Sequence, residues 1–165
     1  MSRYLFFLRK NELSSRVTSC IHNISHFSET KEVFITNNEL LRASSKIKLV
    51  DRNLDLNTIL DQVDIVVIVT RQRFGLLNRA LDALLKDKIV FLPYVTHKAF
   101  TLIYKSERCI SYHSLKDLED KIAHVDSYLR LDVRDRENLV EQREKLESRN
   151  MIYLKFLLDE AFSKK

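Results

Sequence analysis

Two runs of consecutive apolar residues mark the centre of this chain. Ile65–Val69 and Ile89–Leu92 are rich in β-branched side chains and do not alternate with polar residues. Strands of this kind are covered on both faces, as in parallel sheets sandwiched between helices. The segment Leu76–Lys86 between them has the apolar spacing of a helix. The pattern therefore predicts a strand–helix–strand unit of an α/β fold, with the two strands adjacent or nearly so in the middle of a sheet.

Apolar runs and helical spacing along the rest of the sequence predict further elements. Further strands are predicted at Tyr4–Leu8, Glu32–Ile35, Ile47–Val50 and Arg108–Tyr112. Further helices are predicted at Ser14–Phe27, Leu56–Val63, Ser114–Arg130, Asp132–Asn150 and Tyr153–Phe162. Asn53 or Asp55 is expected to cap the second of these helices, and Ser114 with Asp117 has the spacing of a capping box. Thr96–Lys105 fits a helical turn or a strand.

The order of these elements defines the fold class. With right-handed crossovers it predicts a Rossmann-like, doubly wound parallel sheet of five or six strands, followed by C-terminal helices. A chain of 165 residues is long enough for one core that needs no disulfide or metal. We expect a single α/β domain over residues 1–165, with residues 132–165 as a helical extension.

Composition narrows the functional classes. The formal charge is +5, but the 28 basic and 23 acidic residues are interspersed, as on solvated helix faces. This mixture favours other ligands over nucleic acid. The chain has one glycine, Gly75, and one proline, Pro93, which excludes the glycine-rich phosphate cradles of the Walker and dinucleotide types.

Cysteine and histidine usage gives little sign of metal chemistry. Cys20 and Cys109 have apolar neighbours and no CxxC spacing, which is typical of core thiols in a reducing compartment. His22 and His26 are four residues apart but lack the glutamate of an HExxH motif. The apolar run Tyr4–Leu8 is too short for a signal peptide or a membrane span. We expect a cytoplasmic protein with no metal site, no cofactor and no membrane span.

Basic residues follow two of the predicted strands. Arg9 and Lys10 come after the first strand, and Arg71 and Arg73 follow the Ile65–Val69 strand. Ligands of open α/β sheets bind at the carboxyl ends of the strands. With Gly75 and Arg79, these residues are expected to form a positively charged, concave anion site. His97 is expected at the same rim.

A family resemblance begins at the helix after this loop. Asn78, Arg79, Asp82, Ala83, Leu85 and Asp87 resemble the N-x-R-x-x-E-A-x-A-x-G signature of the carboxyl-terminal half of GT-B glycosyltransferases, particularly the group 1 and spore-maturation CgeB-like enzymes. The flanking segments 47–67 and 106–122 resemble the family's strands and its D-L-x-x-K-I helix. The likeness covers roughly residues 45 to 160, by the order of elements more than by identity.

The resemblance implies a nucleotide-sugar donor site. Asp82 would accept hydrogen bonds from donor hydroxyls, while Arg71, Arg73 and Arg79, with Arg9 and Lys10, would face the diphosphate. The sequence departs from the family pattern at Asp82, where the family has Glu, and at Asp87, where it has Gly. The family's glycine-rich first loop is replaced by residues 9–12, Arg-Lys-Asn-Glu.

Three functions stay open on the sequence. The chain resembles only the donor-binding half, so a glycosyltransferase activity would need a second domain or partner. Met151–Phe162 is apolar enough to bind such a protein partner or to form a homodimer. A degenerate, non-enzymatic Rossmann-like interaction module is the alternative, and a nucleic-acid binder is the third. Arg79 and Asp82, spaced i, i+3, would then be a surface ion pair.

Overall fold

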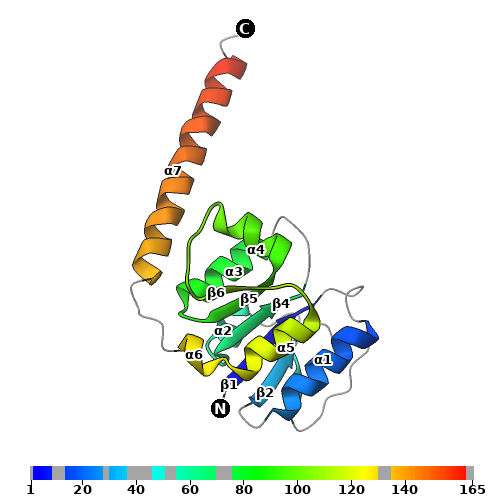
Figure 1. The fold of residues 1–165 in the computed structure, drawn as a ribbon. Helices are drawn as coiled ribbons and strands as arrows, with labels where there is room; N and C mark the ends of the chain where they lie inside the picture. The colour runs from blue at the N-terminus through cyan, green and yellow to red at the C-terminus, as the bar shows by residue number, and fades with distance from the viewer. Residues whose placement is uncertain are drawn as a thin grey trace.

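Six parallel strands form one sheet in the computed structural model (Figure 1). The structure describes residues 2–8, 14–27, 30–36, 46–50, 55–69, 76–129 and 135–162, without the side chains of residues 76, 77, 127, 129, 135 and 153–162. The strands are β1 (Ser2–Phe7), β2 (Thr30–Ile35), β3 (Ile47–Leu49), β4 (Ile65–Ile68), β5 (Ile89–Pro93) and β6 (Cys109–Tyr112). Their order, β3-β2-β1-β4-β5-β6, is that of a doubly wound Rossmann-like sheet. The predicted fold class is confirmed.

The neighbouring interior strands β4 and β5 are buried on both faces, as their unalternated sequences predict. Val67 on β4 and Phe91 on β5 are 0% exposed, and the register pairs them directly. Odd-numbered residues of β4 and β5 face one apolar cluster, and even-numbered residues face the other. The sheet therefore separates two cores, each of which needs its own layer of helices.

The helices divide between these two layers. α1 (Ser15–His26), α5 (Leu115–Ala123) and the residues around α6 (Asp126–Leu129) cover one face. α2 (Leu56–Leu60), α3 (Leu76–Leu85) and α4 (Tyr94–Thr101) cover the other. Figure 1 shows α1 and α5 side by side, away from α3 and α4.

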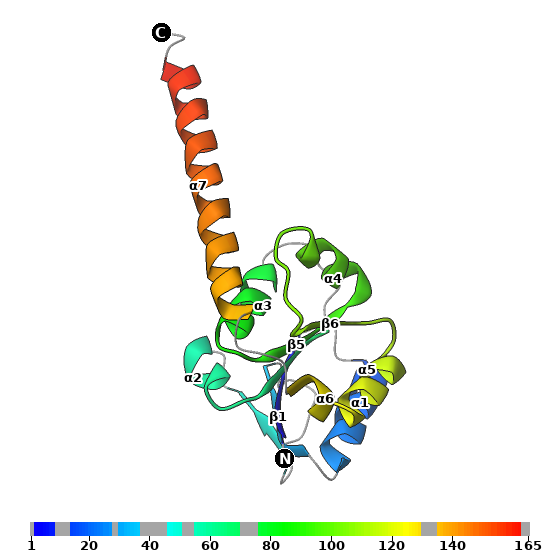
Figure 2. The same cartoon turned by 60° about the vertical axis from the view of Figure 1, so that its left-hand side comes forward.

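The last helix, α7 (Asp135–Phe162), belongs to the domain only at its beginning. Leu139 is 0% exposed in the core beneath α3, and Leu146 packs against its edge. Met151 and Ile152 are then 65% and 71% exposed. Figure 2 shows the rest of the helix running away from the sheet and its covering helices. No helix in the described ranges is long and apolar enough to cross a membrane.

Several predicted boundaries were wrong. The chain 135–162 is one helix rather than two, because no glycine or proline interrupts it and the pairs Glu141–Lys145 and Arg143–Glu147 bridge its turns. The predicted helix Ser114–Arg130 divides into α5 and α6. There, the ring Nδ1 of His124 lies 2.8 Å from the Asp120 carbonyl where α5 ends.

α2 and α4 differ from the sequence prediction by smaller amounts. α2 ends at Leu60, before the predicted Val63, and Asp55 is its N-cap residue without a side-chain hydrogen bond. Asn53, the other predicted cap, lies outside the described residues. The ambiguous segment after β5 is helical from Tyr94 to Thr101.

Candidate functional site

The sheet order reverses between β1 and β4. From β1 the chain builds outward through β2 to β3, and then returns to place β4 on the other side of β1. In open α/β sheets the crevice at the carboxyl ends of such a pair of strands is the usual ligand site. In sequence, Arg9 and Lys10 follow β1, and Arg71, Arg73 and Gly75 follow β4. These five predicted site residues lie outside the described residues, so their grouping stays a prediction.

Arg79 and Asp82 are described, and their side chains have different neighbours. The guanidinium carbon of Arg79 lies 5.1 Å from the centre of the Phe7 ring, the last residue of β1. This is a cation–π contact, which holds an exposed cation close to the reversal point. Asp82 lies close enough to Arg143 on α7 that its negative charge, after the larger effect of Glu147, helps to raise the pKa of Arg143.

A buried tyrosine completes the hydrogen bonding at the end of β4. The Ile89 N–H donates to the Asp64 carbonyl at 3.2 Å, and donors of a parallel ladder recur every second residue. The residue due to donate to the Ile68 carbonyl is therefore residue 93, which is the only proline of the chain and has no N–H. The Tyr112 hydroxyl donates to that carbonyl instead, at 3.0 Å.

A threonine has a similar place at the end of β1. The Thr36 N–H donates to the Phe6 carbonyl at 3.2 Å, which continues the β1–β2 ladder. The next donor is the Leu8 N–H, and it donates to the Thr36 hydroxyl oxygen at 3.1 Å. At the end of each of these two strands, a backbone group therefore bonds to a side-chain hydroxyl. The hydroxyl comes from Thr36, after β2, for β1, and from Tyr112, at the end of β6, for β4.

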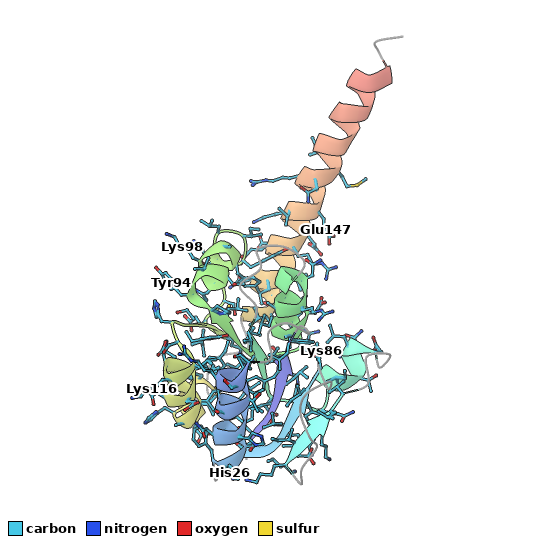
Figure 3. The ribbon with its side chains drawn as sticks, turned by 90° about the vertical axis from the view of Figure 1, so that its right-hand side faces the viewer. His26, Lys86, Tyr94, Lys98, Lys116 and Glu147 are labelled. Atoms are coloured by element: carbon cyan, nitrogen blue, oxygen red, sulfur yellow. The ribbon has the colours of Figure 1, made fainter. Side chains whose placement is uncertain are left out.

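The rim beyond β5 and β6 carries a stacked aromatic pair. The rings of Tyr94 and His113 lie 4.5 Å apart at an interplanar angle of 25°. Figure 3 shows Tyr94 on the same flank of the molecule as Lys98 and Lys116. The loop that carries His113 is fixed by α5, because the Ser114 hydroxyl accepts from Asp117 N–H and Asp117 accepts from His113 N–H. This realises the predicted capping-box variant.

The charge of Asp117 is stabilised by the same contacts. Partial burial raises the pKa of Asp117, but the His113 amide and then Lys121 outweigh that effect and hold the pKa below its usual value. The Lys121 ammonium lies 3.1 Å from the carboxylate and also donates to the Ser111 carbonyl at 2.7 Å. The end of β6 is thereby tied to both the first and the last turn of α5.

His97 and Cys20, which could in principle act as a metal ligand or a nucleophile, are held in structural contacts. The His97 Nε2 lies 3.1 Å from the Cys109 carbonyl, which can only accept, so this nitrogen is the donor. Burial, followed by the charge of Glu119, raises the pKa of Cys20 to about 12. Such a thiol is a poor nucleophile. Across the described parts of the chain, no group of three or more His, Cys, Asp or Glu residues is placed to hold a metal.

Thr36 and Tyr112 were missed by the reading of the sequence. Tyr112 has a detectable signal, because a proline at the end of a buried strand removes one ladder donor and requires a replacement. Thr36 has no such signal, since its role depends on the register between β1 and β2. Comparison with known families and with curated proteins finds no match in sequence.

Proposed function

We propose that this chain binds the diphosphate of a nucleotide-sugar donor at the carboxyl ends of β1 and β4, as the donor-binding half of a glycosyltransferase-like protein. The single observation that carries the proposal is the reversal of strand order between β1 and β4. In sequence, the two strands at this point are followed by Arg9 with Lys10 and by Arg71 with Arg73. A ligand with two adjacent phosphates suits such a pair of basic segments.

Two further features support an anionic ligand. The guanidinium of Arg79 lies over the ring of Phe7 at the carboxyl end of β1. Its positive charge would add to that of Arg9 and Lys10, which follow Phe7 in the sequence. α1 also begins directly after the segment that follows β1, with Ser14 as its N-cap residue. The amino end of a helix carries a partial positive charge, which favours phosphate.

The role of Asp82 in this proposal comes from the family resemblance. A carboxylate accepts hydrogen bonds from sugar hydroxyls, which are stronger than those between neutral groups. Asp82 is partly buried on α3 and lies near Arg143 of α7. A sugar bound at Asp82 would lie beside the first half of α7, so that residues of both α3 and α7 would contact it.

Calorimetry with uridine diphosphate and guanosine diphosphate tests the proposal. We expect one of them to bind, and we expect Arg73→Ala with Arg79→Ala to abolish binding. Arg149→Ala is the matched control, since Arg149 is an exposed arginine of α7 far along the helix from Leu139. Equal affinity in the double variant and the control would contradict the site, and no binding of either nucleotide by the wild type would contradict the function.

A non-enzymatic interaction module is the second candidate, and one observation favours it. Met151 and Ile152 are exposed where α7 leaves the domain, and the sequence that follows to Phe162 is mainly apolar. Exposed apolar surface of this kind marks binding sites for other proteins. A nucleic-acid role would instead show a steep loss of affinity with salt. Absence of nucleic-acid binding at low salt would exclude that role.

A further inference from the structure

We infer that Thr36 and Tyr112 are positioning residues, which fix the carboxyl ends of β1 and β4 and so the starting points of the two basic segments that follow. The inference deepens the proposed function and rests on it for the nature of the ligand. Its own basis is geometric. Each residue closes the last hydrogen bond of a strand that borders the reversal of strand order.

Tyr112 fixes the carboxyl end of β4. Because Pro93 cannot donate, the Ile68 carbonyl would have no ladder partner from β5. Tyr112 is 5% exposed and belongs to β6, on the far side of β5. Its side chain crosses β5, so that the hydroxyl reaches the carbonyl of Ile68, the last residue of β4. The end of β4 is thus held by a strand that is not its neighbour.

Thr36 fixes the carboxyl end of β1. The Thr36 hydroxyl accepts from the Leu8 N–H at 3.1 Å and lies 3.4 Å from both the Phe6 and the Leu8 carbonyls. One side chain therefore contacts three backbone groups at the end of β1, just before Arg9 in the sequence. A backbone bond, from Val69 N–H to the Phe7 carbonyl at 3.4 Å, joins the two strand ends to each other. Displacement of either end would therefore also affect the other.

A buried hydroxyl far from the strand ends separates positioning from general stability. Thr30 provides a comparison, because its hydroxyl donates to the Ile24 carbonyl at 2.7 Å and is buried, but lies at the start of β2. Loss of that hydrogen bond removes a comparable contact at the amino edge of the sheet. An effect shared by all three residues is therefore structural, whereas an effect of Thr36 and Tyr112 alone is positional.

The experiment compares Thr36→Val, Tyr112→Phe and the control Thr30→Val in the full chain. Amide hydrogen exchange, followed by NMR without ligand, is measured at Leu8 and Val69. We expect about tenfold faster exchange at Leu8 in Thr36→Val and at Val69 in Tyr112→Phe, relative to Thr30→Val. Thr36→Ser keeps the hydroxyl and should restore slow exchange at Leu8. Faster exchange spread uniformly over the sheet in all three variants would overturn the inference.

Nucleotide affinity provides the second readout. Uridine and guanosine diphosphate should bind several-fold more weakly to Thr36→Val and Tyr112→Phe than to Thr30→Val, with Thr36→Ser close to the wild type. Equal affinities in all variants of a binding-competent protein would also overturn the inference. Failure of the wild type to bind either nucleotide would overturn the proposed function alone, since the exchange measurement still decides whether the two hydroxyls fix the strand ends.

Discussion

Removal of the Tyr112 hydroxyl should destabilise the protein, and the cost should depend on Pro93. Tyr112→Phe leaves the Ile68 carbonyl buried without its 3.0 Å donor. An unsatisfied buried backbone group costs about 1–3 kcal/mol. The ring itself is retained, so the packing of Tyr112 in the core is unchanged and the effect reports the hydrogen bond.

Pro93→Ala supplies the missing donor. Alanine at position 93 has an N–H, which the register between β4 and β5 directs toward the Ile68 carbonyl. On its own this change gives up about 0.4–1 kcal/mol, because proline restricts the unfolded chain. In its presence, however, Tyr112→Phe no longer leaves the carbonyl unsatisfied. The two substitutions should therefore be coupled by roughly 1 kcal/mol, with the double variant more stable than the sum of the single effects predicts.

Urea unfolding of the four proteins, followed by far-ultraviolet circular dichroism, measures this cycle. Equal m-values would show that the unfolded state is the same in each. The proposed role of the Tyr112 hydroxyl is refuted if Tyr112→Phe costs the same in the wild type and in the Pro93→Ala variant, because the hydroxyl would then not replace the ladder donor. It is refuted equally if Tyr112→Phe costs less than about 0.5 kcal/mol, the range of surface substitutions.

Three further predictions concern the helices and the thiols. Leu139→Ala should cost about 2–5 kcal/mol in urea unfolding, because Leu139 is fully buried, whereas Met151→Ala should change stability by less than about 0.5 kcal/mol. The pKa of Asp117 is lowered in the folded state, so Asp117 stabilises the protein above its usual pKa of 3.8, and this stabilisation is lost as the pH falls below that value. Asp117→Asn should therefore reduce the loss of stability with falling pH. An unchanged pH dependence of the free energy of unfolding would contradict this. Cys20 should resist a thiol reagent at pH 8 in the folded state and react on unfolding, since its pKa is about 12; rapid labelling of the native protein would show that the thiol is accessible.

The sequence predicts the sheet well because its central strands carry a strong signal. β4 and β5 are short, rich in β-branched residues and buried on both faces, and this combination of length and composition favours a strand over a buried helix. The divided helix after β6 was not foreseen, because the apolar pattern of the sequence does not show that α5 ends at His124, where the ring lies 2.8 Å from the Asp120 carbonyl. α7 was divided wrongly for the opposite reason. A change from charged to apolar residues near position 150 resembles a boundary, yet nothing in the backbone chemistry there ends a helix.

The candidate site was predicted less completely than the fold. The position of the reversal follows from strand order, which depends on contacts between segments far apart in sequence. Arg79 was predicted beside a phosphate, and its neighbour in the structure is the Phe7 ring of β1. Asp82 was expected to face a ligand or Arg79, and the charge it influences is that of Arg143. Neither neighbour can be read from the helix alone, because one lies on β1 and the other on α7.

The 165-residue chain by itself should bind a nucleotide sugar without transferring it. Transfer requires an acceptor held in line with the donor, and the correct orientation of two reactants supplies roughly 7–11 kcal/mol of the reduction in the barrier. The sheet offers one wall at the ends of β1 and β4, and under the proposed function the acceptor would be held by another domain. Donor binding should therefore be measurable by calorimetry, while transfer to an added acceptor should appear only with a second polypeptide, for which the exposed residues Met151 and Ile152 are the expected contact. Met151→Asp should then abolish that stimulation and leave donor binding intact. Multiple turnovers by the monomeric chain alone would contradict this account, because one wall would then suffice to hold both substrates.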